Sequence, residues 1–476
     1  MVAILGANSV SGGYEVSNSL RFNDGDSPQL MRNSSGGADG NEKIWTWSGW
    51  VKRSTLGTQQ AIFTNGENNS GEGKMFFDTD DKLAINNDGQ NGSNNKTSRV
   101  FRDVSSWYHI VWAVDVTQSS NDDRWKLYIN GELISASEYG TPTINNADGY
   151  IQRYSIMDVG IGVRARFQQS GNSAMYFDGY IAEVNFIDGQ QKAPTDFGEF
   201  DNNGVWIPKA YDGTYGTNGF YLQFEQTGTG TDASGIGADT SGNDNHFAVT
   251  NLAATDVTTD TCTNNFATLN SIWRNASAHS NTYSEGNLKI NLNSSGGNTY
   301  STIAVSQGKW YFEFETLSNF QCQFEGRTTD NFADYSAGAG NTTFTWYYSG
   351  NIKVNNSDSG VSQAYGHQSN NTNETKEICG VAVDLDNNKV YFHRQGTYVN
   401  SGNPSTGSNG ITITNAEYMF GFSNDSGTTR NVANFNFGNP AFAISSGNTD
   451  GKYGNFEYAP PSGYYALCTK RLAEFG

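Results

Sequence analysis

The strongest constraint on this chain is a succession of short segments in which apolar and polar residues alternate. In residues 44–52, Trp and Val alternate with smaller or polar residues, and residues 308–315 repeat this pattern. A period of two is typical of a β-strand, whose successive side chains point to opposite faces of a sheet. Gly and Asn separate the segments, and Asn130-Gly131 is the signature of a type I′ hairpin turn. Because no long stretch has helical periodicity, the pattern predicts an all-β protein.

The size and composition of the chain indicate more than one folded domain. At about 100–200 residues per domain, 476 residues predict two or three domains. The chain contains 55 Gly, 25 Tyr, 28 Phe and 10 Trp, and aromatic residues favour pleated, half-buried surfaces. Only 16% of the residues are charged, and a disordered acidic chain would have few aromatic residues. We therefore expect folded domains with full hydrophobic cores.

The charge and the cysteines argue against several classes of protein. A net charge of −19 repels phosphates, so nucleic acid is not an expected partner. Four widely spaced cysteines form no CxxC pair, which argues against a zinc site and a disulfide framework. The N-terminal segment lacks a positively charged region, and no stretch reaches about 20 apolar residues. We therefore expect neither a signal peptide nor membrane insertion.

Four motifs in the first part of the chain resemble those of a known domain family. The motifs are Trp-Ser-Gly-Trp-Val-Lys at 47–52, Trp-Tyr-His-Ile-Val at 107–111, Leu-Tyr-Ile-Asn-Gly at 127–131 and Phe-Asp-Gly-Tyr-Ile-Ala-Glu-Val at 177–184. Their order and spacing resemble a laminin G-like domain of the concanavalin A-like type. The resemblance implies a jelly roll of two antiparallel sheets, and we assign it, with an N-terminal extension, to residues 1–225.

The segment that follows this first domain has two interpretations. Residues 239–245 resemble the Asp-x-Ser-Gly-Asn-x-Asn turn that lies near the start of many laminin G-like domains. Here the turn comes after the body of the domain. Residues 226–265 are therefore either a linker or a permuted strand that completes the first domain.

The last part of the chain resembles a SPRY domain. It contains Gly-Lys-Trp-Tyr-Phe-Glu at 308–313, Gly-Val-Ala-Val-Asp at 380–384 and Asn-Phe-Gly at 436–438. One hairpin, at 393–396, lacks the usual Asn-Gly, so we expect its loop to differ. SPRY domains are themselves concanavalin A-like. The predicted fold is thus all-β, with two concanavalin A-like jelly-roll β-sandwich domains in tandem, the second at residues 266–476.

The sequence offers little support for an enzyme. Concanavalin A-like glucanases carry a Glu-x-Asp-x-x-Glu pattern that supplies two carboxylates, and this pattern is absent. Glu313 and Glu315 share one strand face, which we interpret as a solvated face. The five histidines form no HExxH pair, and we expect His109 to be structural. No catalytic residue is assigned, and the chain is predicted to be non-enzymatic.

Calcium is the only cofactor that the resemblance suggests. Laminin G-like and lectin relatives hold Ca²⁺ at the sandwich rim through Asp, Asn and backbone carbonyl oxygens, as expected for a hard cation. The candidate ligands here are Asp24, Asp26, Asp78 and Asp80. Residues 384–388 partly resemble a calcium loop, although Lys389 stands where an EF-hand has Gly. Each of these clusters can equally be a polar turn.

The laminin G-like block followed by a SPRY-like block resembles a type of virion-surface protein encoded by marine bacteriophages. The resemblance implies assembly in the host cytoplasm and a place on the virion surface, which fits the lack of a signal peptide. It also implies contacts with other virion proteins and a homo-oligomeric state. We expect a tail fibre or similar appendage that binds a host cell-surface glycan or protein. The alternative is a structural subunit, such as a capsid decoration or tail-collar protein; an extracellular adhesin and a glycoside hydrolase rank lower.

Overall fold

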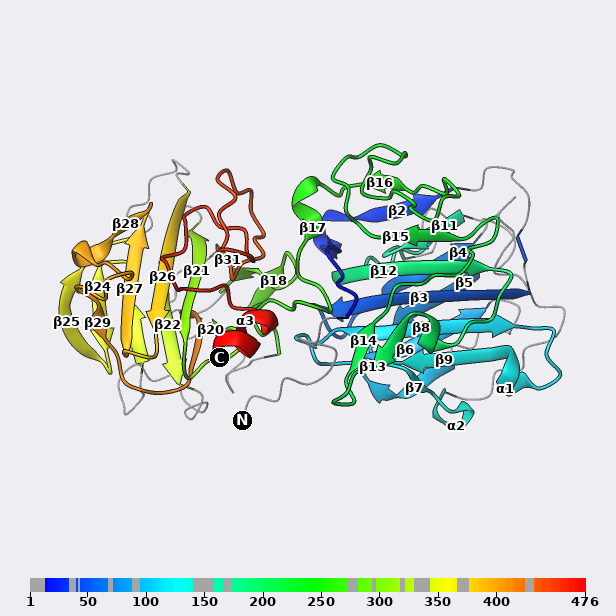
Figure 1. Ribbon diagram of the computed structural model, residues 1–476, viewed down its shortest axis with the longest axis horizontal. Coiled ribbons are helices and arrows are strands. Elements are labelled where there is room, and N and C mark those ends of the chain that lie inside the picture. The colour runs from blue at the N-terminus through cyan, green and yellow to red at the C-terminus, as the bar shows by residue number, and fades with distance from the viewer. Residues whose placement is uncertain are drawn as a thin grey trace. The chain divides into compact units, whose positions relative to one another are not determined.

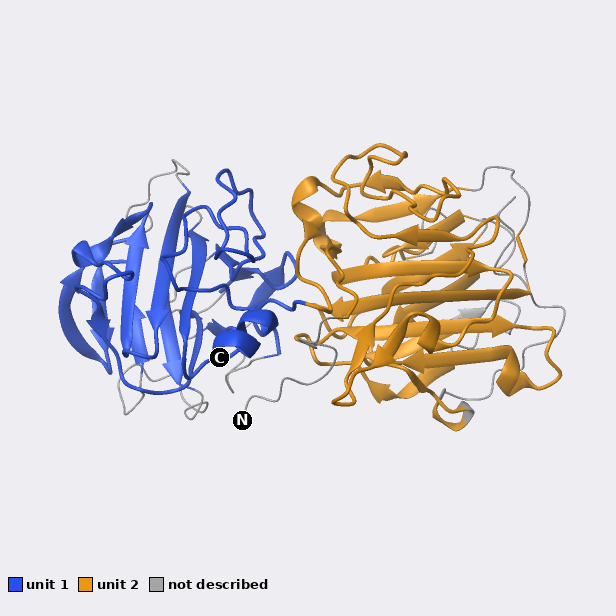
Figure 2. Cartoon of the chain, in the orientation of Figure 1, with its two compact units in different colours: residues 1–4, 264–476 blue, residues 5–263 orange. Residues whose placement is uncertain are grey.

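The computed structural model describes residues 13–33, 40–41, 43–66, 72–87, 95–139, 158–165, 173–272, 281–292, 297–316, 322–328, 343–365, 376–423 and 432–476. The chain divides into two compact units, shown in different colours in Figure 2. We call residues 5–263 the N-terminal unit and residues 264–476 the C-terminal unit. Each unit is built almost entirely from antiparallel strands (Figure 1).

The described part of the N-terminal unit holds two large sheets. The first has eight strands, in the order β10-β9-β8-β3-β12-β1-β17 with β15 paired to β12. Their bounds are β1 (Ser19–Phe22), β3 (Ile44–Arg53), β8 (Tyr108–Asp115), β9 (Trp125–Ile129), β10 (Glu132–Leu133), β12 (Gly179–Asp188), β15 (Phe220–Leu222) and β17 (Val257–Thr258). The second has seven strands, in the order β16-β2-β11-β4-β5-β6-β7. Their bounds are β2 (Gln29–Arg32), β4 (Gln60–Gly66), β5 (Glu72–Phe77), β6 (Lys82–Asn87), β7 (Asn95–Val100), β11 (Asp158–Ile161) and β16 (Ala248–Thr250).

The alternation along β3 determines which residues enter the core of this unit. Trp45, Trp47 and Val51 are buried in the cluster between the two sheets. Trp50 and Lys52 lie on the opposite face of β3, because successive side chains of a strand alternate. That outer face is also covered, since Trp50 and Trp206 belong to a second buried cluster. Trp206 comes from a small hairpin of β13 (Gly198–Phe200) and β14 (Trp206–Pro208).

The segment after residue 225 contributes strands to the N-terminal unit. β16 pairs with β2, and β17 pairs with β1. The turn that begins at Asp239 is held by its own carboxylate, which accepts backbone N–H bonds from Tyr221, Ser241 and Asn245 at 2.8 Å each. Strands from both ends of the unit therefore lie side by side in its sheets.

The described part of the C-terminal unit also forms two sheets. One has eight strands, in the order β18-β19-β31-β21-β26-β27-β28 with β29 paired to β27, and the other has six, in the order β20-β30-β22-β23-β24-β25. The bounds in the first are β18 (Thr282–Ser284), β19 (Lys289–Asn291), β21 (Lys309–Thr316), β26 (Glu377–Asp384), β27 (Lys389–Arg394), β28 (Thr397–Tyr398), β29 (Ile411–Thr412) and β31 (Val432–Asn436). In the second they are β20 (Asn298–Tyr300), β22 (Gln323–Thr328), β23 (Thr343–Trp346), β24 (Asn351–Val354), β25 (Ser357–Ser362) and β30 (Tyr418–Ser423).

The core of the C-terminal unit follows the same alternation. Phe312 and Phe314 of β21 lie between the sheets, together with Trp346. Tyr311, on the other face of β21, belongs to a separate buried cluster with Phe456. The alternating strands and the two packed sheets confirm the predicted fold class of tandem all-β sandwiches.

Short helices are peripheral in both units. The described helices are α1 (Asn121–Arg124), α2 (Ala136–Tyr139) and α3 (Thr469–Phe475), and the 3₁₀ turns are η1 (Asp24–Asp26), η3 (Pro194–Asp196), η4 (Ala254–Asp256) and η5 (Val399–Ser401). Within the described ranges, no helix has the length and apolar character needed to cross a membrane. All four cysteines are buried and none forms a disulfide.

Two hairpin turns test the loop predictions. Asn130 and Gly131 have φ angles of 50° and 80°, the positive values of a type I′ turn, so that prediction is confirmed. Gln395 and Gly396 also have positive φ angles, 51° and 76°. The expectation of a different loop is therefore wrong, because both turn residues have the positive φ angles that an Asn-Gly turn would have. Gly396 tolerates positive φ, and the Gln395 side chain is held by a hydrogen bond from the Tyr458 hydroxyl at 2.9 Å.

Candidate functional site

The candidate site is built on an irregularity in the central strand β12. The pairing of β12 with β3 shifts register between Ala182 and Asn185, as in a β-bulge. Within this bulge Glu183 has a φ angle of 53°, which few residues other than Gly adopt. Such strained backbone persists where the surrounding structure holds it, and it concentrates at functional sites.

Two tyrosine hydroxyls hold the Glu183 side chain. Tyr221 donates to Oε2 at 2.6 Å and Tyr14 donates to the same oxygen at 3.2 Å. The two hydroxyl oxygens lie 2.8 Å apart. Glu183 is only 7% exposed, yet within the described residues no hydrogen bond reaches its other oxygen, Oε1. Because protein donors leave this oxygen unoccupied, it is available as a contact point for a ligand.

The electrostatics of the site favour a protonated carboxyl group near neutral pH. Burial raises the pKa of Glu183 from 4.5 to about 7, and the negative charge of Glu225 adds to the shift. Burial likewise raises the pKa of Tyr14 to about 12, so its hydroxyl stays neutral. A perturbed carboxyl group in such a setting is a marker of functional sites.

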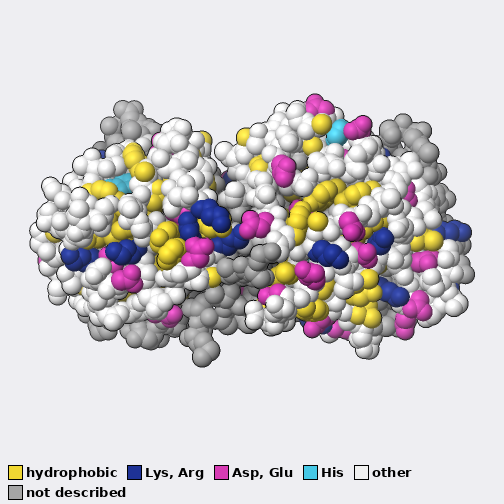
Figure 3. Space-filling model, viewed as in Figure 1, with side chains coloured by type: hydrophobic (Ala, Val, Ile, Leu, Met, Phe, Trp, Pro, Cys, Tyr) yellow, Lys and Arg dark blue, Asp and Glu magenta, His cyan; other side chains and the backbone are white. Residues whose placement is uncertain are grey.

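Two further residues extend the site along the sheet. The Tyr215 hydroxyl donates to Asn185 Oδ1 at 2.8 Å, and the Tyr215 ring stacks on Tyr221 with ring centroids 6.1 Å apart. The rings of Tyr14, Tyr215 and Tyr221 are half-buried. We define the Glu183 cluster as Tyr14, Glu183, Asn185, Tyr215 and Tyr221. In the same orientation as Figure 1, Figure 3 shows hydrophobic side chains gathered over the region of β12 and β15.

The chemistry of the Glu183 cluster suits recognition of a polar ligand with apolar faces. Half-buried tyrosine rings offer flat surfaces, and their hydroxyls both donate and accept hydrogen bonds. The free Glu183 oxygen supplies one more acceptor when ionised, or a donor when protonated. Sugars present this combination of C–H faces and hydroxyl groups. No sequence pattern marked these residues as a site, although an acidic residue between Ala182 and Val184 in an apolar strand is a detectable signal.

A second arrangement in the N-terminal unit superficially resembles a catalytic dyad. Ser48 Oγ lies 2.9 Å from His109 Nε2, and Trp206 Nε1–H donates to His109 Nδ1 at 3.0 Å. Because Nδ1 accepts a hydrogen bond, neutral His109 carries its proton on Nε2 and donates it to Ser48. His109 is 1% exposed and burial lowers its pKa to about 3. The ring therefore does not act as a base toward Ser48, and the structural role predicted for His109 is confirmed.

The C-terminal unit also contains a buried carboxyl group, Glu313. Its side chain accepts backbone N–H bonds from Glu457 at 3.0 Å and Tyr458 at 2.8 Å. It also accepts bonds from Tyr311 at 2.9 Å and Asn436 at 3.2 Å. Both oxygens are therefore occupied by protein donors. Burial still raises the pKa of Glu313 to about 7.

The solvated-face interpretation of Glu313 and Glu315 is wrong. Glu313 is 0% exposed and Glu315 is 6% exposed. The chain after β31 returns over this face and supplies the backbone donors of Glu457 and Tyr458. Strand alternation identified the shared face, but it gave no information about a distant segment that covers it.

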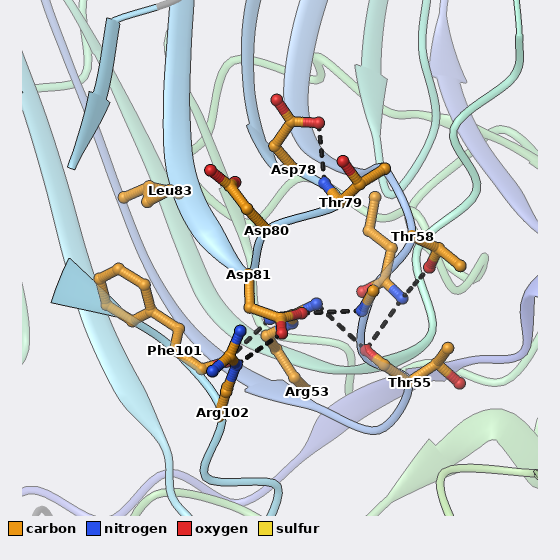
Figure 4. A network of polar contacts seen from close by, with 12 residues as sticks. Arg53, Thr55, Thr58, Asp78, Thr79, Asp80, Asp81, Leu83, Phe101 and Arg102 are labelled. Carbon is orange, nitrogen blue, oxygen red and sulfur yellow. Dashed lines mark hydrogen bonds and ion pairs between the residues drawn. The ribbon is translucent and has the colours of Figure 1, made fainter. Parts of the chain in front are cut away.

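Asp78 and Asp80, two of the calcium candidates, lie beside basic residues. Lys96 pairs with Asp78 and lies 3.7 Å from Asp80, and Lys82 is 3.5 Å from Asp80. The neighbouring Asp81 faces Arg53 and Arg102, at 3.2 and 2.8 Å (Figure 4). These cations already balance the carboxylate charge that would attract Ca²⁺.

The other calcium candidates are single turns. Asp24 and Asp26 are exposed in the turn η1, and Asp26 accepts a hydrogen bond from Asn23 at 2.6 Å. Asp384 accepts the Asn387 backbone N–H at 3.0 Å and pairs with Lys309 at 3.0 Å. Over the described ranges, no group of three or more His, Cys, Asp or Glu side chains is arranged to hold a metal ion. Asp24, Asp26, Asp78 and Asp80 stay candidate calcium ligands that no finding tests, and the cations beside Asp78 and Asp80 disfavour binding there.

Comparison with protein families identifies the first sandwich. The model of the concanavalin A-like lectin/glucanases superfamily, of the laminin G type, matches residues 23–193. The N-terminal unit contains a laminin G-like domain. This match runs from β2 through the end of β12 and includes Glu183, whereas Tyr14, Tyr215 and Tyr221 lie outside it. The hydroxyl partners of Glu183 therefore come from segments that flank the matched region.

Solved structures with similar folds include one pair of domains and two smaller matches. Domains LG4-5 of the mouse laminin α1 chain align with 9% identity and a TM-score of 0.30, over 92% of each chain. The SPRY domain of human HERC1 aligns with 13% identity and a TM-score of 0.24, over 31% of this chain and 87% of that domain. A putative carbohydrate binding protein from Bacteroides ovatus aligns with 13% identity and a TM-score of 0.33, over 50% of this chain and 60% of that protein. Sequence comparison with curated proteins found no significant match.

Proposed function

We propose that this chain is a non-enzymatic binding protein of a virion surface, and that its N-terminal unit binds a host-surface saccharide at the Glu183 cluster. The observation that carries the proposal is the Glu183 carboxyl group. It is more than nine-tenths buried, its Oε1 accepts no bond from the described residues, and half-buried tyrosine rings surround it. Ligand sites typically combine aromatic surface with a few polar groups of fixed orientation.

The charge of the chain narrows the class of saccharide. A net charge of −19 disfavours polyanionic glycans, because like charges repel at long range. A raised Glu183 pKa means that a large share of the carboxyl groups is protonated at neutral pH. A protonated carboxyl donates a hydrogen bond to a sugar hydroxyl without bringing a buried charge to the interface. We therefore expect a neutral saccharide.

The virion location rests on the resemblance of the two-block chain to phage surface proteins. Such a protein would assemble with other virion proteins, as a homo-oligomer, in a tail fibre or similar appendage. The orientation of the Ser48–His109 bond and the occupied oxygens of Glu313 support a role without catalysis. The rival role, a capsid decoration or tail-collar subunit, predicts that the folded chain binds no host surface.

The test is binding of the labelled full-length chain to host cells and to immobilised neutral glycans. We expect Glu183→Gln and Tyr221→Phe to weaken binding about tenfold, the effect of losing one good hydrogen bond. Tyr458→Phe is the matched control, because it removes a half-buried tyrosine hydroxyl from the other unit. Equal binding by all three variants would reject the Glu183 cluster as the site. No binding by the folded wild-type chain would favour the structural subunit instead.

A further inference from the structure

Lys52 is the least exposed lysine in the described part of the chain. Its side chain is 1% exposed, on the outer face of β3, and its Nζ lies 2.8 Å from Asp260 Oδ2. The Asp260 side chain is 0% exposed. Lysine and aspartate are almost never buried this deeply. The pair therefore needs a physical explanation beyond an ordinary surface ion pair.

The surroundings of this pair are aromatic and closed. Trp107 and Tyr180 belong to the buried cluster on this side of the sheet. Trp107 Nε1–H donates to Asp260 Oδ1 at 3.3 Å, and Lys52 Nζ lies 5.3 Å from the centre of the Tyr180 ring. The Ser19 hydroxyl donates to the Asp260 backbone carbonyl at 2.6 Å and so fixes the backbone there. Both side chains are thus held in place without access to bulk water.

We propose that Lys52 and Asp260 condense to form an intramolecular isopeptide bond. The Lys52 ammonium first transfers a proton to the Asp260 carboxylate, which leaves a neutral amine and a neutral acid. The Lys52 Nζ lone pair then attacks Asp260 Cγ, the C–O bond of one carboxyl oxygen breaks, and one water molecule leaves. The product is an amide between Nζ and Cγ, and no oxidant, reductant or external group is consumed.

The environment favours each part of this step. Burial disfavours two separate charges, so proton transfer within the pair is far easier than in water. The Lys52 Nζ lies 2.8 Å from Asp260 Oδ2, the atom bonded to Cγ, so a rotation of the carboxyl group is enough to bring Nζ over the face of that carbon for attack. The Trp107 indole N–H is already bound to Oδ1 and can stabilise the negative charge that develops on that oxygen. Trp107 is therefore the positioning and stabilising group of the reaction.

Neighbouring ion pairs show what distinguishes Lys52. Arg53, the next residue, pairs with Asp81 at 3.2 Å and its side chain is also 0% exposed, but a guanidinium stays protonated and is a poor nucleophile. Lys309 pairs with Asp384 at 3.0 Å, but its side chain is 32% exposed and therefore hydrated. Only Lys52 combines an amine, a carboxyl partner and near-complete burial among the described pairs.

The bond would have a clear structural consequence. It would join the central strand β3 to the segment directly after β17, which pairs with β1 at the edge of the same sheet. The laminin G-like domain would then be closed covalently between its interior and its last segment. A cross-link that spans a long stretch of chain stabilises mainly by restricting the unfolded state. The inference rests on no part of the proposed saccharide binding.

The test is the intact mass of the denatured, full-length wild-type chain. We expect a mass lower than that of the sequence by one water molecule, and a branched peptide that joins Lys52 to Asp260 after proteolysis. Lys52→Arg keeps the charge pair and Asp260→Ala removes it, and both should have their full sequence mass. Trp107→Phe should leave a fraction of the chains without the cross-link.

Three outcomes would overturn the inference. The first is a wild-type chain at its full sequence mass. The second is a loss of water that persists in Lys52→Arg. The third is a dehydrated aspartate in a linear peptide, since an aspartate can also lose water by cyclising onto its own backbone. The first and third outcomes are read from the wild-type chain, so the inference can be rejected even if a variant misfolds.

Discussion

Glu183 in the N-terminal unit and Glu313 in the C-terminal unit are the same kind of group in two different settings. Each lies on the outer face of an eight-stranded sheet, and burial raises the pKa of each to about 7. Glu313 accepts two backbone N–H bonds and two side-chain bonds that together occupy both oxygens. Glu183 receives its two bonds on one oxygen, from half-buried tyrosines.

This difference separates a structural acid from a candidate site. A carboxyl group that satisfies otherwise orphaned backbone donors holds a segment in place, and it leaves no atom for a ligand. A carboxyl group with one free oxygen inside a strained bulge keeps a contact available. A raised pKa alone does not distinguish the two roles; the count of donors on each oxygen does.

The largest expected effect is the loss of Glu313. Glu313→Gln places an amide NH₂ against protein N–H or hydroxyl donors, because both oxygens are occupied. We expect this change to lower the free energy of unfolding of the C-terminal unit by about 3–5 kcal/mol. Glu183→Gln should cost the N-terminal unit under about 1 kcal/mol, since one amide oxygen still accepts both tyrosine bonds. Hydrogen exchange of peptides from each unit measures both values, and equal losses would refute the comparison.

The pH dependence of stability offers a sharper comparison within the N-terminal unit. The raised pKa of Glu183 stabilises the folded state as pH falls from about 7 to 4.5, because the folded state binds the proton first. The pKa of His109, lowered from 6.5 to about 3, has the opposite sign, because below pH 6.5 only the unfolded state is protonated. The two effects oppose each other between pH 6.5 and 4.5.

Removing the Glu183 carboxyl group should reveal the effect of His109 on the stability of the N-terminal unit. We expect the N-terminal unit of Glu183→Gln to lose about 2–3 kcal/mol between these pH values, from His109 alone. The wild-type N-terminal unit should change little over the same range. Denaturant unfolding at several pH values, followed by tryptophan fluorescence, measures the difference. A flat profile in the variant would mean that His109 is not held neutral in the folded state.

The two Gly-containing hairpins should differ in their tolerance of a side chain. A Cβ at Gly131 would lie 2.4 Å from Cε3 of the buried Trp206 ring, whereas at Gly396 it would lie 2.8 Å from Cε1 of the half-buried Tyr458 ring. Both glycines have positive φ, so the backbone strain of alanine is common to the two sites. We expect Gly131→Ala to cost about 1–2 kcal/mol more than Gly396→Ala. Thermal unfolding of the two variants provides the measurement, and the reverse order would contradict it.

The smallest expected effect concerns calcium. Because Lys96 pairs with Asp78 and lies near Asp80, we expect neither Ca²⁺ nor a chelator to change the melting temperature of the N-terminal unit. The C-terminal unit, where none of Asp24, Asp26, Asp78 or Asp80 lies, is the internal reference. Differential scanning calorimetry with each addition is sufficient. A rise in the N-terminal transition with Ca²⁺, abolished in Asp78→Asn, would establish the site that the resemblance implies.

Several features could be predicted because they depend on local sequence. Alternation in residues 44–52 and 308–315 predicted strands, and in the structure Trp45, Trp47, Phe312 and Phe314 of these strands lie in the two cores. Asn130-Gly131 defined its hairpin, because the positive φ angles of a type I′ turn are a local requirement. The prediction that the loop at Gln395-Gly396 would differ from an Asn-Gly turn was wrong, because Gly396 supplies one positive φ angle and a tertiary hydrogen bond from Tyr458 supports the other, at Gln395.

Periodicity and turn chemistry operate over a few residues, and they were enough to predict an all-β protein, while the two sandwich domains followed from the resemblance to laminin G-like and SPRY domains. Tertiary structure alone decided which carboxyl groups are buried, what each oxygen contacts and which segments close each sheet. Tyr14 and Tyr221 reach Glu183 across 169 and 38 positions, and Lys52 reaches Asp260 across 208. Contacts between residues so far apart in the sequence depend on how strands pair across the whole sheet. A pattern with a period of two residues carries no information about them.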